Sequence, residues 1–295
     1  MNNLINIDDL KKILPVRSNH DHKGRFGHLL VIAGSRYYTG AGKLSAYAGM
    51  HSGVGLVTLA VPATVIDVIA SSLMEIIFYP LPSTKEGTFA EEGADRIIEF
   101  SKDKNAVLLG PGLSQHPSTI NFVKKVLPQI KAPLIIDADG LNAISDNPGI
   151  LRMCEGTPVL TPHPGEMSRL IKKSIKEIQQ DREQCAIDFA RQMGVVVVLK
   201  GYHTVIANPD GAYAINTTGG HGLSKGGTGD VLAGLIAGLV AQGMSPYHAS
   251  QLGVWLHGRA GDLAEQALHP RSMTAGDLFD FLHQVWRELD PQPYD

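Results

Sequence analysis

Six short apolar segments constrain the fold of this chain more than any other feature of its sequence. Longer stretches with helical periodicity separate them, and most are apolar at consecutive rather than alternate positions. A strand without alternation is buried on both faces, which requires helices above and below a mostly parallel sheet. The segments are HLLVIAGS (28–35), LVTLAVP (56–62), AVLLG (106–110), PLIIDADG (133–140), TPVLTPH (157–163) and VVVVLKG (195–201).

The intervening segments predict helices, for example GKLSAYAGMHSGV, GADRIIEFSKD and SIKEIQQDREQCAIDFARQMG. Residues 203–216 differ, because two short strands flank a PDG turn there, and this pattern predicts a hairpin closing one sheet edge. From residue 228 the pattern is helical, with breaks near 243–246 and 269–273. Without a repeat, low-complexity tract or linker, residues 1–295 read as one α/β domain.

Composition and charge narrow the classes of function. The chain has 295 residues, 43% of them hydrophobic and 19% charged, and a net charge of −3. This balance does not favour capture of nucleic acid or of an anionic membrane. The two cysteines, Cys154 and Cys185, have no metal-ligand spacing and suggest a reducing cytoplasm. We see no export signal and no apolar run suited to spanning a bilayer.

Small or polar residues follow most of the expected strands. In an open α/β sheet, ligands bind beyond the carboxyl ends of the strands. Five segments that are distant in sequence should therefore line one crevice: Gly34 and Ser35, Gly110 to Gly112, Asp137 to Gly140, His163 to Glu166, and Lys200 with Gly201.

Two glycine-rich segments fail the test for a P-loop. GSRYYTGAGKLS (34–45) has Tyr37 where the first glycine is needed and Leu44 where Ser or Thr is needed. The second segment, GGHGLSKGGTGDVLAG, has Ser224 in place of the glycine before Lys225. A Walker nucleotide site is therefore excluded.

The second segment instead predicts an anion site. Gly226, Gly227, Thr228 and Gly229 lead into a helix expected to begin at about Thr228, and free amides at a helix N-terminus attract anions. Asp230 in the first turn has two interpretations. It could stabilise the helix dipole by about 0.3–1 kcal/mol, or it could take a proton from a hydroxyl that attacks a phosphoryl group. The residues alone leave both open.

The stretch GGTGDVLAG resembles the anion hole and catalytic aspartate of the ribokinase-like superfamily. Over about residues 20–285 the chain is similar to the NAD(P)H-hydrate dehydratase family, which repairs hydrated nicotinamide cofactors. The resemblance implies a three-layer α/β/α sandwich with a mostly parallel central sheet. The other matching segments are HKGRFGHLLVIAGSRYYTGAGKLSAYAGMHSGVGLVTLAVP, LLGPGLS, IIDADGLN, LTPHPGEMSRL and LKGYHTVIANPDG.

The resemblance also implies an activity. The family acts on the S epimer of NADHX or NADPHX, in which water has added to the nicotinamide ring. ADP or ATP, with Mg²⁺, phosphorylates the ring hydroxyl, and elimination of phosphate restores NAD(P)H. Asp230 would deprotonate the hydroxyl, and the amides of Gly227, Thr228 and Gly229 would hold the developing charge.

Residue by residue, the resemblance implies two groups of binding residues. On the residues alone, Ala41 could be a small residue at a strand-to-helix junction, Gly112 a turn glycine, and His163 a loop residue before a helix. The implied substrate contacts are Ala41, Gly112, His163 and Asp230. The implied nucleotide contacts are Lys200, Gly201, Tyr202, His203, Thr204 and Gly229.

Other polar residues receive no catalytic role. Asp137 and Asp139 could support the phosphate or Mg²⁺ region, or Asp139 could cap a helix beginning near Leu141. His257 and Trp255 are expected in the core or an interface. No third cluster completes a metal site with the residues His20 to His22.

The resemblance suggests a homotetramer, and no epimerase domain is recognised before the first motif, so the R hydrate would need a separate epimerase. Two other functions remain to be tested. A kinase acting on a vitamin-precursor alcohol would use the same anion site and Asp230. A nucleotide-binding sensor without catalysis would have no need of Asp230.

Overall fold

A nine-stranded sheet forms the centre of the molecule, in a computed structural model that describes residues 3–291. The strand order is β3-β2-β1-β4-β5-β6-β7-β8-β9; the pairings from β3 through β7 are parallel, and β8 and β9 are antiparallel. The strands are β1 (His28–Ile32), β2 (Leu56–Pro62), β3 (Ile77–Leu81), β4 (Ala106–Leu109), β5 (Leu134–Ile136), β6 (Val159–Leu160), β7 (Val196–Leu199), β8 (Thr204–Ala207) and β9 (Tyr213–Asn216).

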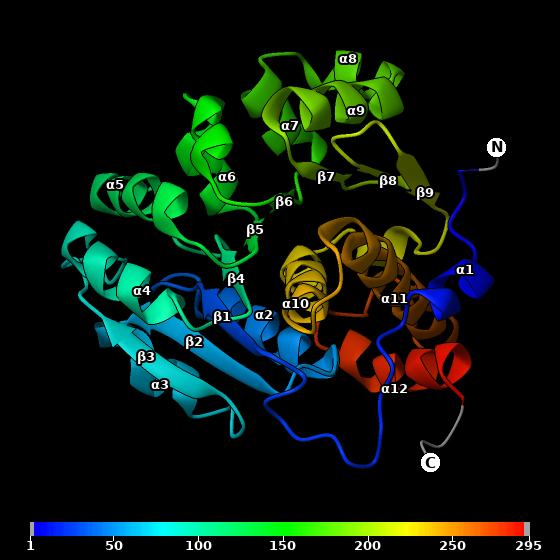
Figure 1. The fold of residues 1–295 in the computed structure, drawn as a ribbon, viewed down its shortest axis with the longest axis horizontal. Helices are drawn as coiled ribbons and strands as arrows, with labels where there is room; N and C mark the ends of the chain where they lie inside the picture. The colour runs from blue at the N-terminus through cyan, green and yellow to red at the C-terminus, as the bar shows by residue number, and fades with distance from the viewer. Residues whose placement is uncertain (1–2, 292–295) are drawn as a thin grey trace.

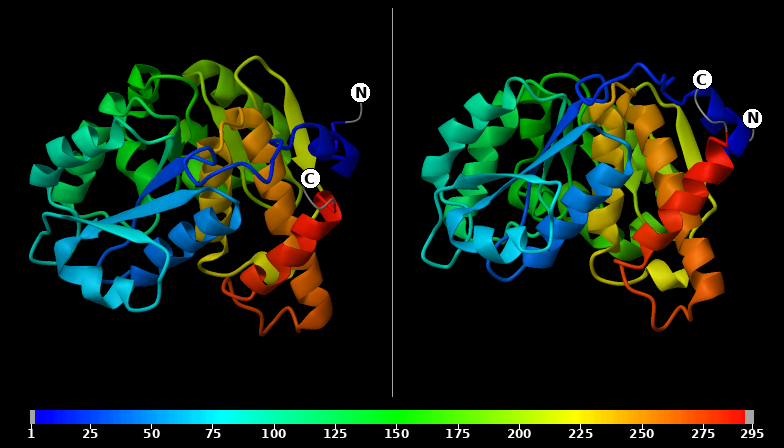
Figure 2. Two further views of the ribbon diagram at one scale, coloured as in Figure 1. Left: turned by 60° about the horizontal axis from the view of Figure 1, so that its bottom comes forward. Right: turned by 90° about the horizontal axis from the view of Figure 1, so that it is seen from below.

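Helices cover both faces of this sheet (Figures 1 and 2). The α-helices are α1 (Ile7–Lys12), α2 (Thr39–His51), α3 (Ile66–Ala70), α4 (Ala94–Ser101), α5 (Pro117–Val126), α6 (Asp139–Ile144), α7 (Pro164–Ile171), α8 (Ile175–Gln180), α9 (Arg182–Met193), α10 (Thr228–Ala241), α11 (Pro246–Ala267) and α12 (Leu278–Leu289). Among residues 3–291, no helix has the length and apolarity needed to cross a bilayer.

Two hydrophobic clusters lie on opposite faces of the sheet, and neighbouring strand residues point into different ones. Leu29 and Val31 belong to the cluster that includes residues of α2, α10, α11 and α12, whereas Leu30 and Ile32 belong to the cluster that includes residues of α4, α5, α6 and α9. All four side chains are fully buried. This two-sided burial is the reason why these strands lack alternation, and it confirms the predicted α/β architecture with a mostly parallel sheet.

The six predicted parallel strands and the edge hairpin are confirmed, with two additions. Strand β3 was not predicted: it is an edge strand that contains Pro80 and leaves Ile77 46% exposed. The predicted helical segment SIKEIQQDREQCAIDFARQMG is two helices, because Asp181 has φ −149° and caps α9 by accepting from the Gln184 amide.

The N-terminal segment covers the β9 edge of the sheet. Ile5 N–H donates to the Ile215 carbonyl at 2.9 Å, and Ile215 N–H donates to the Asn3 carbonyl at 2.8 Å. Leu4 and Ile215 thus form a parallel bridge beside the hairpin.

Candidate active site at the carboxyl ends of the strands

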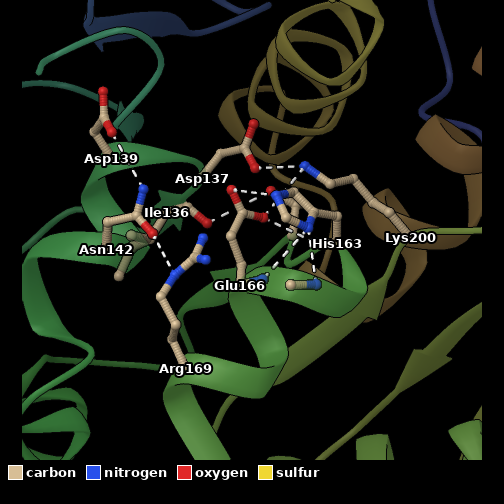
Figure 3. Close-up of polar contacts among 10 residues, drawn as sticks. Ile136, Asp137, Asp139, Asn142, His163, Glu166, Arg169 and Lys200 are labelled. Carbon is tan, nitrogen blue, oxygen red and sulfur yellow. Dashed lines mark hydrogen bonds and ion pairs between the residues drawn. The ribbon is translucent and has the colours of Figure 1, made fainter. Parts of the chain in front are cut away.

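Polar residues from three adjacent strands meet at one edge of the sheet, as predicted for the crevice. Asp137 follows β5, His163 follows β6, and Lys200 follows β7. Figure 3 shows their side chains pointing toward one another, with Glu166 of α7 between them.

Lys200 is the cation at the centre of this group. Its Nζ lies 2.8 Å from Asp137 Oδ1 and 3.9 Å from Glu166 Oε2. The side chains of Asp137 and Glu166 are only 1% and 6% exposed, and that of Lys200 is 18% exposed. Burial works to lower the pKa of Lys200, but the charges of Asp137 and Glu166 outweigh it and raise this pKa. Burial also raises the pKa of Glu166, against the effect of Lys200.

His163 is locked at the start of α7 by a capping box. Its Nδ1 accepts from the amides of Gly165 (2.9 Å) and Glu166 (3.3 Å), while Glu166 Oε2 accepts from the His163 amide at 2.8 Å. A nitrogen that accepts two amides carries no proton, so the neutral ring holds its proton on Nε2. Burial and then Lys200 lower the pKa of His163, which keeps it neutral. His163 therefore carries its N–H on Nε2, which lies 3.4 Å from Glu166 Oε1.

The N-terminus of α10 is open to an anion. Its N-cap is Gly227 with φ +94°, so no side chain caps the first amides. Thr228 turns its hydroxyl back to the carbonyls of Leu223 (2.8 Å) and Lys225 (2.9 Å). The Lys225 ammonium donates to the carbonyls of Arg271 and Met273, and these bonds attach the loop before α10 to the segment before α12. Glycines with free amides and a helix dipole favour phosphate here.

Asp230 lies in the first turn of α10. Burial raises its pKa to about 7, the nearby charge of Asp137 adds to this shift, and Lys200 opposes it. The carboxyl is therefore poised to gain or lose a proton near neutral pH.

A cavity of about 280 Å³ lies beside this loop. Asn216, Thr218 and the buried His257 line part of it. The lining also includes six residues predicted for the nucleotide or anion site: Lys200, Gly201, Tyr202, Thr204, Thr228 and Gly229. His203 lines a neighbouring cavity with Tyr202 and Arg182, and its ring stacks on Tyr202 at 4.0 Å between centroids.

Ala41 and Gly112 also come together. A Cβ at Gly112 would lie 2.8 Å from the Ala41 Cβ and 2.7 Å from the Tyr38 Cβ, so only glycine fits. Ser35 after β1 fixes the loop by donating to the Gly112 carbonyl at 2.7 Å. These residues lie on the β1 and β4 side of the crevice.

Within residues 3–291, no group of three or more His, Cys, Asp or Glu side chains is arranged to hold a metal ion by itself. Mg²⁺ in nucleotide sites usually binds one or two carboxylates and the phosphates of the nucleotide. The buried Asp137 and Glu166 carboxylates fit that shared form of binding.

Comparison with known proteins identifies the family of this chain. The family model for NAD(P)H-hydrate dehydratase matches residues 29–284. The chain belongs to the NAD(P)H-hydrate dehydratase family. It is 44% identical over 279 residues to the bifunctional NAD(P)H-hydrate repair enzyme Nnr of Moorella thermoacetica, covering 95% of this chain and 53% of that protein. The chain thus spans about half the length of such curated relatives.

Other members of the NAD(P)H-hydrate dehydratase family match from end to end. The ADP-dependent (S)-NAD(P)H-hydrate dehydratase of Bacillus subtilis is 35% identical, covering 96% of this chain and 97% of that protein. A crystal structure of the ADP/ATP-dependent NAD(P)H-hydrate dehydratase from Bacillus subtilis, co-crystallised with ATP/Mg²⁺, has a TM-score of 0.84 at 32% identity, covering 97% and 98% of the two chains. A ribokinase-like superfamily protein from Enterococcus faecalis has a TM-score of 0.80 at 26% identity, covering 97% and 95%. The predicted ribokinase-like fold is confirmed.

The candidate site contains residues for which the sequence predicted no role or a different one. Glu166 joins His163 to Lys200, and the His-x-x-Glu spacing of a capping box was the signal for it. His257 is 8% exposed and Trp255 6%, as expected of core residues, but His257 also forms part of the cavity wall. Asp139 begins α6 and accepts from the Ser114 amide at 2.8 Å, so it fixes the loop after β4 and does not cap a helix near Leu141.

Proposed function

We propose that this chain restores NADH and NADPH from the S epimers of their hydrates, NADHX and NADPHX. ADP or ATP phosphorylates the ring hydroxyl, and elimination of phosphate completes this metabolite repair. The observation that carries the proposal is Asp230, a buried carboxyl with a pKa raised to about 7, at the open N-terminus of α10.

In the first step, Asp230 takes the proton of the ring hydroxyl. The hydroxyl oxygen then attacks the terminal phosphorus of the nucleotide, and the bond from that phosphorus to the bridging oxygen breaks to release AMP from ADP, or ADP from ATP. The amides of Gly227, Thr228 and Gly229 stabilise the charge on the transferred group. Lys200 also lies beside these amides, because its Nζ is 3.3 Å from the point where a Cβ at Gly229 would be.

In the second step, the carbon–oxygen bond breaks and phosphate leaves with the bonding electrons. The lone pair of the ring nitrogen forms the transient double bond to that carbon. Loss of a proton from the neighbouring ring carbon then closes the ring double bond of NAD(P)H. Phosphate is a far better leaving group than hydroxide, so the nucleotide makes dehydration feasible.

The cavity of about 280 Å³ supports binding of the AMP portion of the nucleotide along Lys200, Gly201, Tyr202, Thr204 and Gly229. His203 supports the loop by stacking on Tyr202. The substrate ring would lie on the other side of Lys200, near Ala41, Gly112, His163 and Asp230. Mg²⁺ bound with the nucleotide would neutralise phosphate charge, with Asp137 and Glu166 as its protein ligands.

Absorbance at 340 nm tests the activity directly. Purified protein, Mg²⁺ and ADP or ATP are mixed with acid-treated NADH that contains the hydrates, and reduced cofactor should return only when a nucleotide is present. Failure with both nucleotides would contradict the proposal. Nucleotide consumption with a hydroxymethylpyrimidine or thiazole alcohol would instead identify a vitamin-precursor kinase.

The proposal extends to assembly and partners. We expect a homotetramer, which sedimentation equilibrium would measure, and a separate epimerase that supplies the S hydrate from the R form. A cytoplasmic location fits the cysteines Cys154 and Cys185, both of which are free thiols.

A further inference from the structure

Helices α2 and α10 run side by side from the same edge of the sheet (Figure 1), and glycines let their backbones touch. A methyl group at Gly234 of α10 would overlap the carbonyl oxygen of Ser45 and lie 2.8 Å from the Ala48 Cβ. A methyl group at Gly238 would overlap Ser52 Oγ and lie 2.8 Å from the Gly49 carbonyl oxygen. Neither position has room for a side chain.

The contacts follow a matched register. In α10, Asp230, Gly234 and Gly238 are spaced by four residues and share one face. In α2, Ala41, Ser45 and Gly49 have the same spacing. Because Gly234 meets Ser45 and Gly238 meets Gly49, continuing the register by one turn places Asp230 opposite Ala41, at the carboxyl edge of the sheet.

The loop before α10, with Gly227 as its last residue, packs against α2 and the segment that leads into α12. A Cβ at Gly227 would lie 2.7 Å from Leu44 Cδ1 and 3.0 Å from the Ala275 Cβ. Leu44 is next to Ser45, so the same turn of α2 contacts both Gly227 and Gly234. One turn of α2 therefore contacts both α10 and the loop before it.

From this geometry we infer that Gly234 is a positioning residue for the reaction. Its contact with the Ser45 carbonyl sets the gap between Ala41 and Asp230, where the ring hydroxyl of the substrate would meet its base. The inference rests on the proposed function. Its new element is that catalysis depends on a backbone contact in α10 one helical turn from Asp230. A displacement of reacting groups by about 1 Å can lower the rate on the order of 100-fold.

The experiment compares Gly234→Ala with Gly238→Ala. Both add one methyl group to the same seam, but Gly238 lies two turns from Asp230. We expect Gly234→Ala to lower kcat at least tenfold while the Kd for ADP changes less than threefold. Gly238→Ala should lower the Tm by a similar amount and change kcat less than threefold. Equal losses of kcat in the two variants, or unchanged kcat in folded Gly234→Ala, would overturn the inference.

A second variant and crystal structures of the variants distinguish a folding defect from a change in the site. If Gly234→Ala does not fold, Gly234→Ala with Ala48→Gly is measured in its place: it removes the contact with the Ala48 Cβ, and kcat should stay low because the overlap with the Ser45 carbonyl remains. Crystal structures of the variants test the geometry without any assay. Gly234→Ala should widen the Ala41–Asp230 separation more than Gly238→Ala does, and equal separations would contradict the inference even if the wild type failed to act on the hydrates.

Discussion

Lys200 at the end of β7 reaches across β6 to Asp137 at the end of β5, where its Nζ lies 2.8 Å from Oδ1. This ion pair joins the cavity proposed for the nucleotide to the strand that leads into α6. Glu166 brings a second buried carboxyl to 3.9 Å from the same ammonium.

Replacing Lys200 by Met should destabilise the fold by about 3 kcal/mol, because it leaves Asp137 buried without its partner. The double variant Lys200→Met with Asp137→Asn should recover most of that stability. It should not recover ADP affinity, which we expect to fall at least tenfold in both variants. Urea denaturation and calorimetric titration with ADP in the absence of Mg²⁺ would measure the two effects, so that loss of the proposed Mg²⁺ ligand Asp137 does not influence the affinity. Recovery of affinity in the double variant would show that Lys200 does not contact phosphate.

Asp230→Asn should lower kcat by about 100-fold to 10,000-fold, the usual range for removal of a general base. The Kd for ADP should stay within a few fold, because the cavity lining does not include this carboxylate. Stopped-flow absorbance at 340 nm and equilibrium dialysis give the two values. Near-normal turnover in this variant would show that Asp230 is not the base.

The pH dependence of kcat/KM should follow the ionisation of the Asp230 carboxyl. Its pKa of about 7 means that Asp230 is mostly protonated at pH 6 and cannot act as a base there. We expect kcat/KM for the hydrate to rise with pH to a plateau above pH 8, with a midpoint near 7. A midpoint near 4 would indicate that another group controls the rate.

Stability should respond to pH in the opposite sense. Because folding raises the pKa of Asp230 from its usual 3.8, the folded state binds this proton more tightly, and its contribution to stability is lost as pH rises toward 7. Asp230→Asn should therefore stabilise the free protein by as much as about 4 kcal/mol at pH 8 and by less at pH 5. Tm values of both proteins at the two pH values would test this trade between activity and stability.

Two substitutions of His163 distinguish its role as the N-cap of α7 from its proposed role in binding the substrate. Asn is also a strong N-cap residue, so His163→Asn should leave the free energy of unfolding within about 0.5 kcal/mol, whereas His163→Ala should cost about 1 kcal/mol. Both variants lack the Nε2–H donor and should raise KM for the hydrate. If only the Ala variant raised KM, the role of His163 would be confined to holding α7.

The sequence was informative wherever the physical cause was local. Two-sided apolar strands, the PDG hairpin and the start of α10 at Thr228 all follow from short-range pattern. Strand β3 was not predicted because it is half exposed and contains Pro80, so its sequence shows neither the continuous apolar run of a strand buried on both faces nor a clear alternation of apolar and polar residues.

The site was predictable only in part, for a related reason. The glycine loop and Asp230 are contiguous, whereas the Lys200–Asp137 pair joins residues 63 positions apart. A contact of that range depends on strand order, which local pattern does not reveal. The roles assigned to individual residues came from family resemblance and remain to be tested by the variants above.

The bridge between Leu4 and Ile215 has a consequence for solubility. An uncovered strand edge is a template for pairing with other chains, and proteins shield such edges with extra segments or break them with proline. Here residues 3–5 cover β9 at one end of the sheet, and Pro80 interrupts the donors of β3 at the other. A variant trimmed of its first six residues would keep every residue of the site, yet it would expose a hairpin edge that invites aggregation.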